Sequence, residues 1–301
     1  MFKIMAPAKI NLSLEVLGKR PDGYHNIKSV VQTIGLADEL DFSPAAELDF
    51  SADMPGWDGE KSLISRAARL LKSRYDIDAG ARVRLKKRIP LMSGLGGDSS
   101  CAAAALKGFN RLWRLGIGKG QLMEIGAELG SDVPFFFFGG TALIEGRGEL
   151  VTPLGPYPAG WAVIVIPRVD AEGDKTGWLY GNLNAKDFSD GSRTEELVEA
   201  LVQNQPVEPA LLGNAFDRVT TLVWPEIQEC RWQMLKAGAI RVYLSGAGPA
   251  LYSLHRNKAE ADKVFRVLRH GGVEVYLAGV GGLRMTRERE VSSLSLRELP
   301  Q

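Results

Sequence analysis

Residues 89–106 read IPLMSGLGGDSSCAAAAL, a glycine- and serine-rich stretch that runs into four alanines. Alanine is the best helix former, and Asp98, Ser99 and Ser100 are residue types that cap helix starts. The segment before this stretch, residues 81–88, alternates apolar and basic side chains, which is typical of a half-buried strand. The sequence therefore predicts a strand, a glycine loop and a helix N-terminus in succession.

A loop of this kind suits a polyphosphate group. Backbone N–H groups and the positive end of the helix dipole converge there, and glycines let a bulky anion approach the main chain. The alternative use of Gly94, Gly96 and Gly97 is a tight turn with close helix packing. Neither common nucleotide signature fits, because a Walker A loop ends in Gly-Lys-Ser/Thr and a dinucleotide fingerprint needs G-x-G-x-x-G after a hydrophobic strand. The glycines alone leave both interpretations open.

The composition is that of an ordinary globular protein, with 45% apolar and 24% charged residues among 301. This length suffices for two domains or for one large α/β unit. The 37 basic and 36 acidic side chains give a net charge of +1, which does not favour a nucleic-acid partner. Two cysteines, no signal-peptide pattern and no uncharged window of about 18 residues favour a cytoplasmic protein without a membrane partner.

Strand and helix signals are interleaved along the rest of the chain. Residues 9–17 alternate as a half-buried strand, and further strands are predicted at residues 161–167, 241–244, 250–254 and 274–277. Apolar residues on one helical face predict a helix at residues 62–71, with Ser62 as its cap. Between the last two strands a second helix is expected, with one apolar face formed by Val264, Phe265, Val267 and Leu268. The chain from residue 168 to about residue 206 is interpreted as a polar region.

Three blocks of the sequence resemble the motifs of the GHMP small-molecule kinases, a family that includes galactokinase, homoserine kinase and mevalonate kinase. PLMSGLGGDSSCAA at residues 90–103 resembles their phosphate loop, P-x-x-x-G-L-G-G-x-S-S-x-A-A. APAKINLSLEV at residues 6–16 and LSGAGPALYSL at residues 244–254 resemble the first and third motifs, in the family's order. The chain is thus identified as similar to an ATP-dependent kinase that phosphorylates an alcohol, with Mg²⁺ as its metal.

This resemblance implies an α+β fold of two domains with the active site in the cleft between them. The N-terminal domain, residues 1–155, would be the ribosomal-domain-like α/β domain that carries the phosphate loop and the catalytic residues. The C-terminal domain, residues 156–301, would be a ferredoxin-like α+β domain. Its tail, from about residue 283, is expected to be disordered.

The resemblance also implies two catalytic residues. Asp132, in GSDVPFF, would be the base that accepts the proton of the alcohol, and Lys9, in PAKINL, would be the cation beside it. Taken alone, each is more typical of a turn or of surface charge. Residues 135–138 are four phenylalanines, apolar enough to be buried on both faces, so we expect the Asp132 carboxylate to lie against a low-dielectric wall.

The phosphate loop is expected to hold the β- and γ-phosphates of ATP through backbone N–H groups of residues 94–100. Ser99 or Ser100 would either contact Mg²⁺ or cap the helix. Lys87 would either contact phosphate or form a solvated strand end together with Arg88. The predicted ATP-binding residues are Lys87, Pro90, Leu91, Met92, Ser93, Gly94, Leu95, Gly96, Gly97, Asp98, Ser99 and Ser100.

The third motif offers a further loop near the phosphates. Ser245, Gly246 and Gly248 would close over the phosphates, or the same glycines would serve a tight hairpin. Three positions depart from the family pattern, among them Ser62, which stands where an asparagine is common. Asp98 stands where a third glycine is usual, and Cys101 replaces an acidic or amide residue. Because Asp98 brings a negative charge to a phosphate site, a nucleotide-binding homologue with reduced catalysis is an alternative function.

GYH and SDVPFF are typical of one subfamily, whose members phosphorylate the 2-hydroxyl of a cytidine-diphosphate-linked methylerythritol in isoprenoid synthesis. By this resemblance Tyr24 and His25 would stack on and hydrogen-bond to the cytosine. Tyr180 would complete a sandwich around the base, unless Trp178 takes that role. Asn11 and Thr176 complete the predicted substrate-binding residues. A kinase for another small alcohol is the alternative, and we expect a monomer or a homodimer.

Overall fold

The computed structural model describes residues 1–170 and 175–281. Its strands are β1 (Phe2–Lys19), β2 (His25–Ala45), β3 (Leu48–Ala52), β4 (Gly80–Lys86), β5 (Thr141–Gly146), β6 (Leu150–Pro153), β7 (Gly160–Val165), β8 (Gly213–Asn214), β9 (Tyr243–Leu244), β10 (Leu251–His255) and β11 (Val275–Val280). Its α-helices are α1 (Leu63–Tyr75), α2 (Gly97–Leu112), α3 (Lys119–Leu129), α4 (Lys175–Gly181), α5 (Ser192–Val202), α6 (Asp217–Val223), α7 (Pro225–Lys236) and α8 (Lys258–His270). Short 3₁₀ helices are η1 (Gly59–Lys61), η2 (Pro134–Phe137), η3 (Ala185–Asp187) and η4 (Pro209–Leu211).

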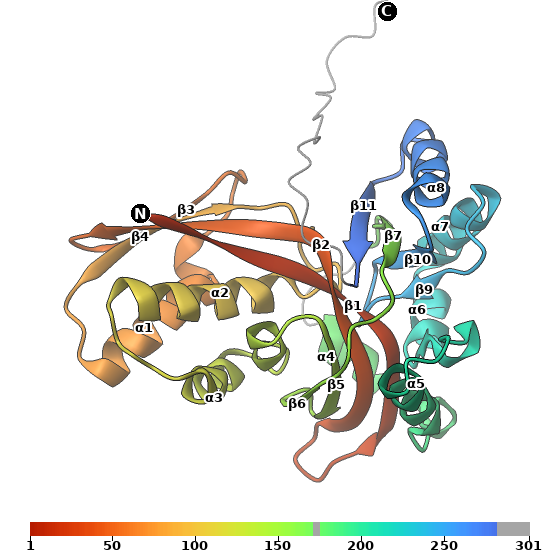
Figure 1. Cartoon of the computed structure of the whole chain (residues 1–301), viewed down its shortest axis with the longest axis horizontal. Coiled ribbons are helices and arrows are strands. Elements are labelled where there is room, and N and C mark those ends of the chain that lie inside the picture. Colours follow the sequence, from red (N-terminus) through yellow and green to blue (C-terminus); the bar gives the residue numbers. More distant parts are fainter. Residues whose placement is uncertain (171–174, 282–301) are drawn as a thin grey trace, which may run out of the picture.

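The long antiparallel pair of β1 and β2 organises the molecule (Figure 1). The described strands form a sheet with the order β3-β4-β2-β11-β7-β10-β9, in which β1 and β5 also pair with β2. Residues 8–16 of β1 are all buried, so the expectation of a half-buried strand there is wrong. The reason is tertiary packing, because both α2 and α5 contact β1. The predicted strand at residues 81–88 is confirmed as β4, which ends at Lys86.

Helices α1, α2 and α3 lie together beside the N-terminal half of the sheet (Figure 1). Helix α2 contacts β1 and β2 as well as both neighbouring helices. Gly108 allows this close approach, because a Cβ atom there would lie 2.2 Å from the ring of Phe42 on β2. The small side chains of the alanine run are buried for the same reason. The predicted succession of strand, glycine loop and helix is therefore confirmed.

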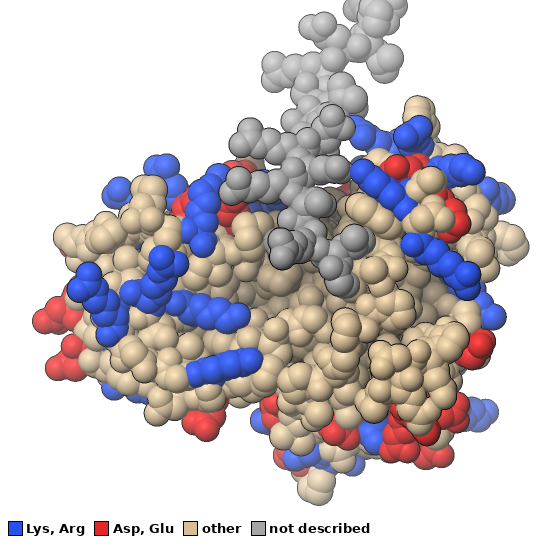
Figure 2. All heavy atoms as spheres, viewed as in Figure 1, with Lys and Arg blue, Asp and Glu red and all other residues tan. Residues whose placement is uncertain are grey.

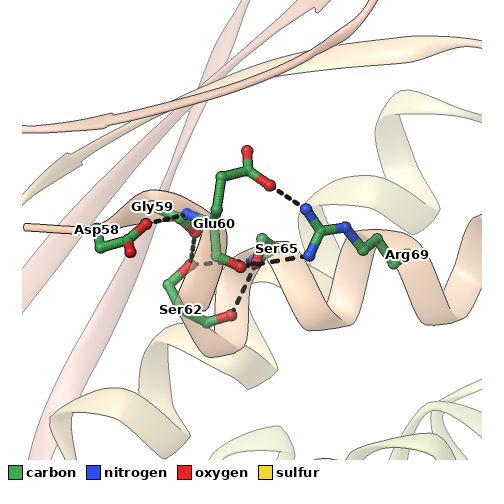
Figure 3. A network of polar contacts seen from close by, with 6 residues as sticks. All are labelled: Asp58, Gly59, Glu60, Ser62, Ser65 and Arg69. Atoms are coloured by element: carbon green, nitrogen blue, oxygen red, sulfur yellow. Dashed lines mark hydrogen bonds and ion pairs between the residues drawn. The ribbon is translucent and has the colours of Figure 1, made fainter.

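The start of α1 also follows the prediction. Ser62 is the N-cap, and its hydroxyl accepts a hydrogen bond from the backbone N–H of Ser65 at 3.1 Å. Glu60, in the turn before the helix, forms an ion pair with Arg69 in the second turn of the helix (Figure 3). The cap satisfies an N–H group that has no partner within the helix. Helix α1 therefore begins where the sequence indicates.

The C-terminal half contains the antiparallel strands β7, β10 and β11, with α8 packed on β7 and β11. The order β9, β10, α8, β11 confirms the predicted strand and helix succession. Strand β11 also pairs with β2 through Val280 and Ile34, so hydrogen bonding continues from one half to the other. The division between residues 155 and 156 stays a prediction. The expected disordered tail lies outside the described residues.

Three further expectations need correction. The supposedly polar region contains α5, whose Leu197 and Leu201 are buried at a helical spacing of four. Val267 is 57% exposed on α8, because the buried face of that helix passes through Val264 and Leu268 instead. The four phenylalanines are not all buried: the first three are buried in η2, and Phe138 is 38% exposed.

Basic and acidic side chains occur on both halves of the face shown in Figure 2. This face is therefore not divided into a basic half and an acidic half. Within residues 1–170 and 175–281, no helix has the length and apolar character needed to cross a membrane.

Candidate active site

A cleft of about 990 Å³ lies where the two halves of the chain meet. Sites for small molecules typically measure roughly 300–1,000 Å³. Predicted residues from six separate parts of the sequence line this cleft: Lys9, Asn11, Tyr24, His25, Pro90, Leu91, Met92, Ser93, Gly94, Gly96, Gly97, Asp98, Ser99, Asp132, Thr176, Tyr180 and Gly246. We call the part formed by residues 90–99, Lys9 and Asp132 the phosphate half, and the part formed by Tyr24, His25 and Tyr180 the aromatic half.

The glycine loop joins β4 to α2 and ends at an uncapped helix start. Gly96 is the N-cap residue with φ +70°, and no side chain caps the helix. The predicted capping by Asp98, Ser99 or Ser100 is therefore wrong, because these residues lie within the first turn of α2. A Cβ atom at Gly96 would lie 2.9 Å from Phe136 and 3.0 Å from Lys9. Tertiary packing thus places the helix start one turn earlier than the serines indicate, and leaves its first N–H groups without side-chain caps.

The loop between β9 and β10, residues 245–250, packs directly on the glycine loop. Ala250 N donates to Ser93 O at 2.9 Å, and the Ser245 hydroxyl donates to Gly94 O at 3.1 Å. Gly94 has φ +85°, and a Cβ atom there would lie 2.4 Å from Ser245 O. Asn214 holds the same loop from the other side by donating to Gly246 O at 2.8 Å. The hairpin alternative for this loop is therefore observed, since residues 245–250 connect the antiparallel strands β9 and β10, and closure over the phosphates stays a prediction.

Lys9 and Asp132 lie side by side in the cleft, with 3.5 Å between Lys9 Nζ and Asp132 Oδ2. The ammonium of Lys9 also donates to Asn11 Oδ1 at 2.7 Å, and the Asn11 amide donates to Ser29 at 2.9 Å. Irregularities in the pairing of β1 with β2 occur on both sides of these residues, between Pro7 and Lys9 and after Asn11. Bulges of this kind redirect side chains near functional sites. They deliver Lys9 and Asn11 to the cleft from a strand that is otherwise packed in the core.

The environment of Asp132 differs from the expected one. Its side chain is 45% exposed, whereas that of Lys9 is 7% exposed. The neighbouring phenylalanines of η2 pack into the core and do not cover the carboxylate. The expected low-dielectric wall beside Asp132 is therefore wrong for the protein without bound ligands. Asp132 faces an open cleft that a ligand can fill.

In the aromatic half, His25 and Tyr180 stack on each other, with 4.9 Å between ring centroids and 20° between ring planes. Tyr180 therefore does not form a sandwich with Tyr24 around an open slot. Tyr24 is 55% exposed, and the Arg147 guanidinium lies 4.8 Å from its ring centroid. Burial, followed by the charge of Lys19, lowers the pKa of His25. The imidazole is therefore neutral at pH 7 and offers one donor and one acceptor.

Five predicted residues do not line the cleft. Lys87 lies behind the loop, where its ammonium pairs at 2.6 Å with Asp38, and both side chains are buried. The same carboxylate accepts hydrogen bonds from the backbone N–H groups of Arg88 and Ile89. Lys87 is thus neither a solvated strand end nor a direct wall of the cleft. The other four are Leu95, Ser100, Ser245 and Gly248, all buried behind the surface.

Other cleft residues carry no local sequence signal. Arg147 and Lys19 add positive charge near the aromatic half, and Ser131 precedes Asp132. Lys175 enters the cleft from α4. Trp178, the alternative to Tyr180, does not line the cleft but lies 6.3 Å from Trp224, measured between ring centroids. Only tertiary structure brings these residues to the cleft, or keeps Trp178 out of it.

Comparison with known families assigns both halves of the chain. Residues 62–140 match the model of the GHMP kinase N-terminal domain, and residues 194–274 match that of the GHMP kinase C-terminal domain. Together these ranges span more than half of the chain. The first range contains the glycine loop and Asp132, and the second contains the loop that covers the glycine loop.

The curated relatives that are most similar in the comparison all carry the name of one kind of GHMP kinase. A 4-diphosphocytidyl-2-C-methyl-D-erythritol kinase of Dehalococcoides mccartyi is 47% identical over 268 residues, which is 89% of this chain and 94% of the relative. The enzyme of the same name from Brevibacillus brevis is 38% identical over 271 residues, 88% of this chain and 91% of the relative.

Solved structures agree. A 4-(cytidine 5'-diphospho)-2C-methyl-D-erythritol kinase superposes with a TM-score of 0.79 at 31% identity, over 93% of this chain and 100% of the other. A homoserine kinase of Cytophaga hutchinsonii, at 20% identity and a TM-score of 0.69 over 93% of this chain and 94% of the other, shares the fold. The chain therefore belongs to the GHMP kinases, and within them to the family of 4-diphosphocytidyl-2-C-methyl-D-erythritol kinases.

Proposed function

We propose that this kinase transfers the γ-phosphoryl group of ATP to the 2-hydroxyl of 4-diphosphocytidyl-2-C-methyl-D-erythritol, a step of isoprenoid precursor synthesis in the cytoplasm. One observation carries the proposal: a glycine loop at a helix start, a Lys–Asp pair and a cluster of aromatic rings line one continuous cleft. The first suits phosphates, the second proton removal and the third a planar base.

Asp132 is the proposed base. Its carboxylate accepts the proton of the 2-hydroxyl as the oxygen forms a bond to the γ-phosphorus. The bond between that phosphorus and the bridging oxygen breaks, and ADP carries away the electron pair. Because Asp132 is 45% exposed, the incoming alcohol has direct access to it. Bound substrate then displaces water from the carboxylate and strengthens its interactions.

Lys9 is the proposed cation at the transferred group. Its ammonium is 3.5 Å from Asp132 and 2.7 Å from Asn11 Oδ1, so the strand holds the charge at one place before ligands bind. Charge held in advance at the developing anion lowers the barrier without a reorganisation cost. Asn11 acts as a positioning residue for Lys9 in addition to any contact with substrate.

The residues of the phosphate half fit a magnesium–nucleotide complex. Within the described residues, no group of three or more His, Cys, Asp or Glu side chains is arranged to hold a metal. Mg²⁺ commonly takes one or two protein oxygens together with phosphate oxygens and waters. Asp98 and Ser99 line the cleft and would supply such oxygens, whereas Ser100 Oγ is buried without a hydrogen-bond partner. When bound, the metal would neutralise the negative charge of the phosphates and so reduce their repulsion by Asp98.

The aromatic half is the proposed cytidine site. Neutral His25 presents a donor and an acceptor to the base, and Tyr24 offers an exposed ring on which the base stacks. Tyr180 supports His25 from behind by stacking. Arg147 and Lys19 provide cations for the diphosphate of the substrate.

A coupled assay of ADP release tests the proposal. The purified chain is offered ATP and MgCl₂ with 4-diphosphocytidyl-2-C-methyl-D-erythritol, and in parallel with homoserine or mevalonate. We expect turnover with the cytidyl substrate and at least about a hundredfold lower kcat/KM with the other alcohols, because they leave the base site empty. Equal or better turnover of another alcohol would assign a different substrate.

A further inference from the structure

Lys175 lies at the point where the glycine loop meets the loop that covers it. It is the first residue of α4, is 8% exposed and lines the cleft. Its ammonium donates to Met92 O at 2.6 Å and also to Gly248 O. Met92 belongs to the glycine loop and Gly248 to the covering loop. A positive charge therefore lies within the phosphate half, at a position that no sequence pattern indicated.

The partners of Lys175 distinguish it from the other buried lysines of the site. Lys9 pairs with Asp132, and Lys87 pairs with Asp38. In the described part of the chain, the hydrogen-bond partners of Lys175 are two neutral carbonyl oxygens. An ammonium has three N–H donors, so one is left for a ligand. A buried ammonium is unfavourable without a counter-ion, and a bound anion supplies one.

The pKa of Lys175 is lowered, as expected for a buried ammonium that a bound anion would stabilise. Burial, followed by the charge of Lys9, lowers this pKa to about 8. The charged groups that share the phosphate half with Lys175 are Lys9 of β1, Asp132 before η2 and Asp98 of α2. A phosphate placed between Lys9 and Lys175 would remove the repulsion between the two ammonium groups and raise the pKa of Lys175.

We propose that Lys175 is a second phosphate-binding cation, which contacts the terminal phosphates of ATP from the junction of the two loops. The inference deepens the proposed function and rests on it for the identity of the ligand. In this arrangement the glycine loop supplies N–H groups, while Lys9 and Lys175 supply positive charge.

Calorimetric titration with ATP and MgCl₂, without any acceptor alcohol, tests the proposal. Lys175→Met removes the charge and keeps the apolar stem, and Lys175→Arg keeps the charge. Lys107→Met is the matched control. Lys107 also donates to a backbone oxygen, that of Phe136 at 2.7 Å, and burial lowers its pKa to about 8, but it does not line the cleft. Thermal melts verify that each variant is folded.

We expect Lys175→Met to weaken ATP binding about tenfold to a hundredfold, as for the loss of a hydrogen bond to a charged group. Lys175→Arg should remain within about threefold of the wild type, and Lys107→Met should match the wild type. Affinity of the wild type should fall by up to about tenfold from pH 7 to pH 9, because deprotonation of Lys175 removes its charge. Lys175→Arg should lack this fall, and any slope that both proteins share belongs to the other groups.

The pH series distinguishes two roles of Lys175: binding of ATP through its positive charge, and a structural link between the two loops. A neutral amine still has two N–H groups for the two carbonyl oxygens, so the structural link persists after deprotonation. If Lys175 had only this role, the ATP affinity would not change with pH. Unchanged ATP binding by Lys175→Met, or a wild-type affinity with the same pH dependence as Lys175→Arg, contradicts the proposal. Because no alcohol is present, these outcomes are independent of whether the cytidyl compound is the acceptor.

Discussion

The two halves of the cleft are built in different ways. In the phosphate half the contacts that shape the glycine loop involve main-chain atoms, as between Ala250 N and Ser93 O at 2.9 Å. In the aromatic half they run between side chains, as in the stack of His25 on Tyr180. Main-chain groups recognise phosphate whatever nucleoside carries it, whereas side chains select a particular base. Changes in the phosphate half should therefore affect turnover and loop stability, and changes in the aromatic half should affect the KM of the cytidyl substrate.

The largest expected effect is that of Asp132→Asn. An amide cannot accept the proton of the alcohol, so kcat should fall by about 10²- to 10⁴-fold. The side chain is 45% exposed, and the ATP affinity and the melting temperature should therefore stay close to those of the wild type. Stopped-flow ADP release and calorimetry measure the two effects. A kcat within threefold of the wild type would remove Asp132 from the role of base.

Gly94→Ala should have the next largest effect, because it tests main-chain packing directly. A Cβ atom there meets Ser245 O at 2.4 Å, and φ is +85°. We expect a loss of about 2–4 kcal/mol in the free energy of unfolding and at least tenfold weaker ATP binding.

Gly116→Ala is the control for Gly94→Ala, since its φ of +68° is similar and nothing lies within 4 Å of its Cβ position. This control should cost about 1 kcal/mol by urea unfolding and leave ATP binding unchanged. If the two variants behave alike, the strain lies in φ alone and the covering loop does not constrain Gly94.

In the aromatic half we expect a smaller and more selective effect. Tyr180→Leu keeps an apolar side chain but removes the ring beneath His25, so the KM of the cytidyl substrate should rise about threefold to tenfold. The ATP affinity should not change. Trp178→Leu, on the same helix but outside the cleft, should leave both constants within twofold. Equal effects of the two substitutions would mean that α4 acts only through its stability.

The smallest expected effect is a pH dependence of substrate binding. The pKa of His25 is lowered from 6.5, so the imidazole is neutral at pH 7 and gains a proton only in more acidic solution. The KM of the cytidyl substrate should be constant above pH 7 and rise by less than about fourfold at pH 6. His25→Gln, which keeps a donor and an acceptor, should lose this dependence. The stability that neutral His25 contributes should likewise decrease as the pH falls, because the unfolded chain binds the proton more readily.

Local patterns predicted the elements of the phosphate half but not their contacts. Alternation, the alanine run and Ser62 predicted β4, α2 and the start of α1, since each depends on neighbours in sequence. The helix start at Gly96 could not be predicted, because contacts with Phe136 and Lys9 decide it.

Lys175 gave no sequence signal at all. Its partner Met92 lies 83 residues away, and a single lysine at the start of a tryptophan-containing helix is ordinary surface sequence. The exposure of Asp132 was also missed, because the phenylalanines that follow it pack away from the cleft. The proposed catalytic pair came from family resemblance, and the 3.5 Å separation of Lys9 and Asp132 is consistent with it.

A crystal structure of the kinase with a non-hydrolysable ATP analogue and the cytidyl substrate tests whether both ligands meet at the glycine loop and Asp132. The account predicts terminal phosphates on the backbone N–H groups of residues 94–99. It also predicts the 2-hydroxyl at about 3 Å from the Asp132 carboxylate, within hydrogen-bond reach of the base. A nucleotide bound away from the glycine loop, or a substrate hydroxyl with Asp132 out of reach, would contradict the account.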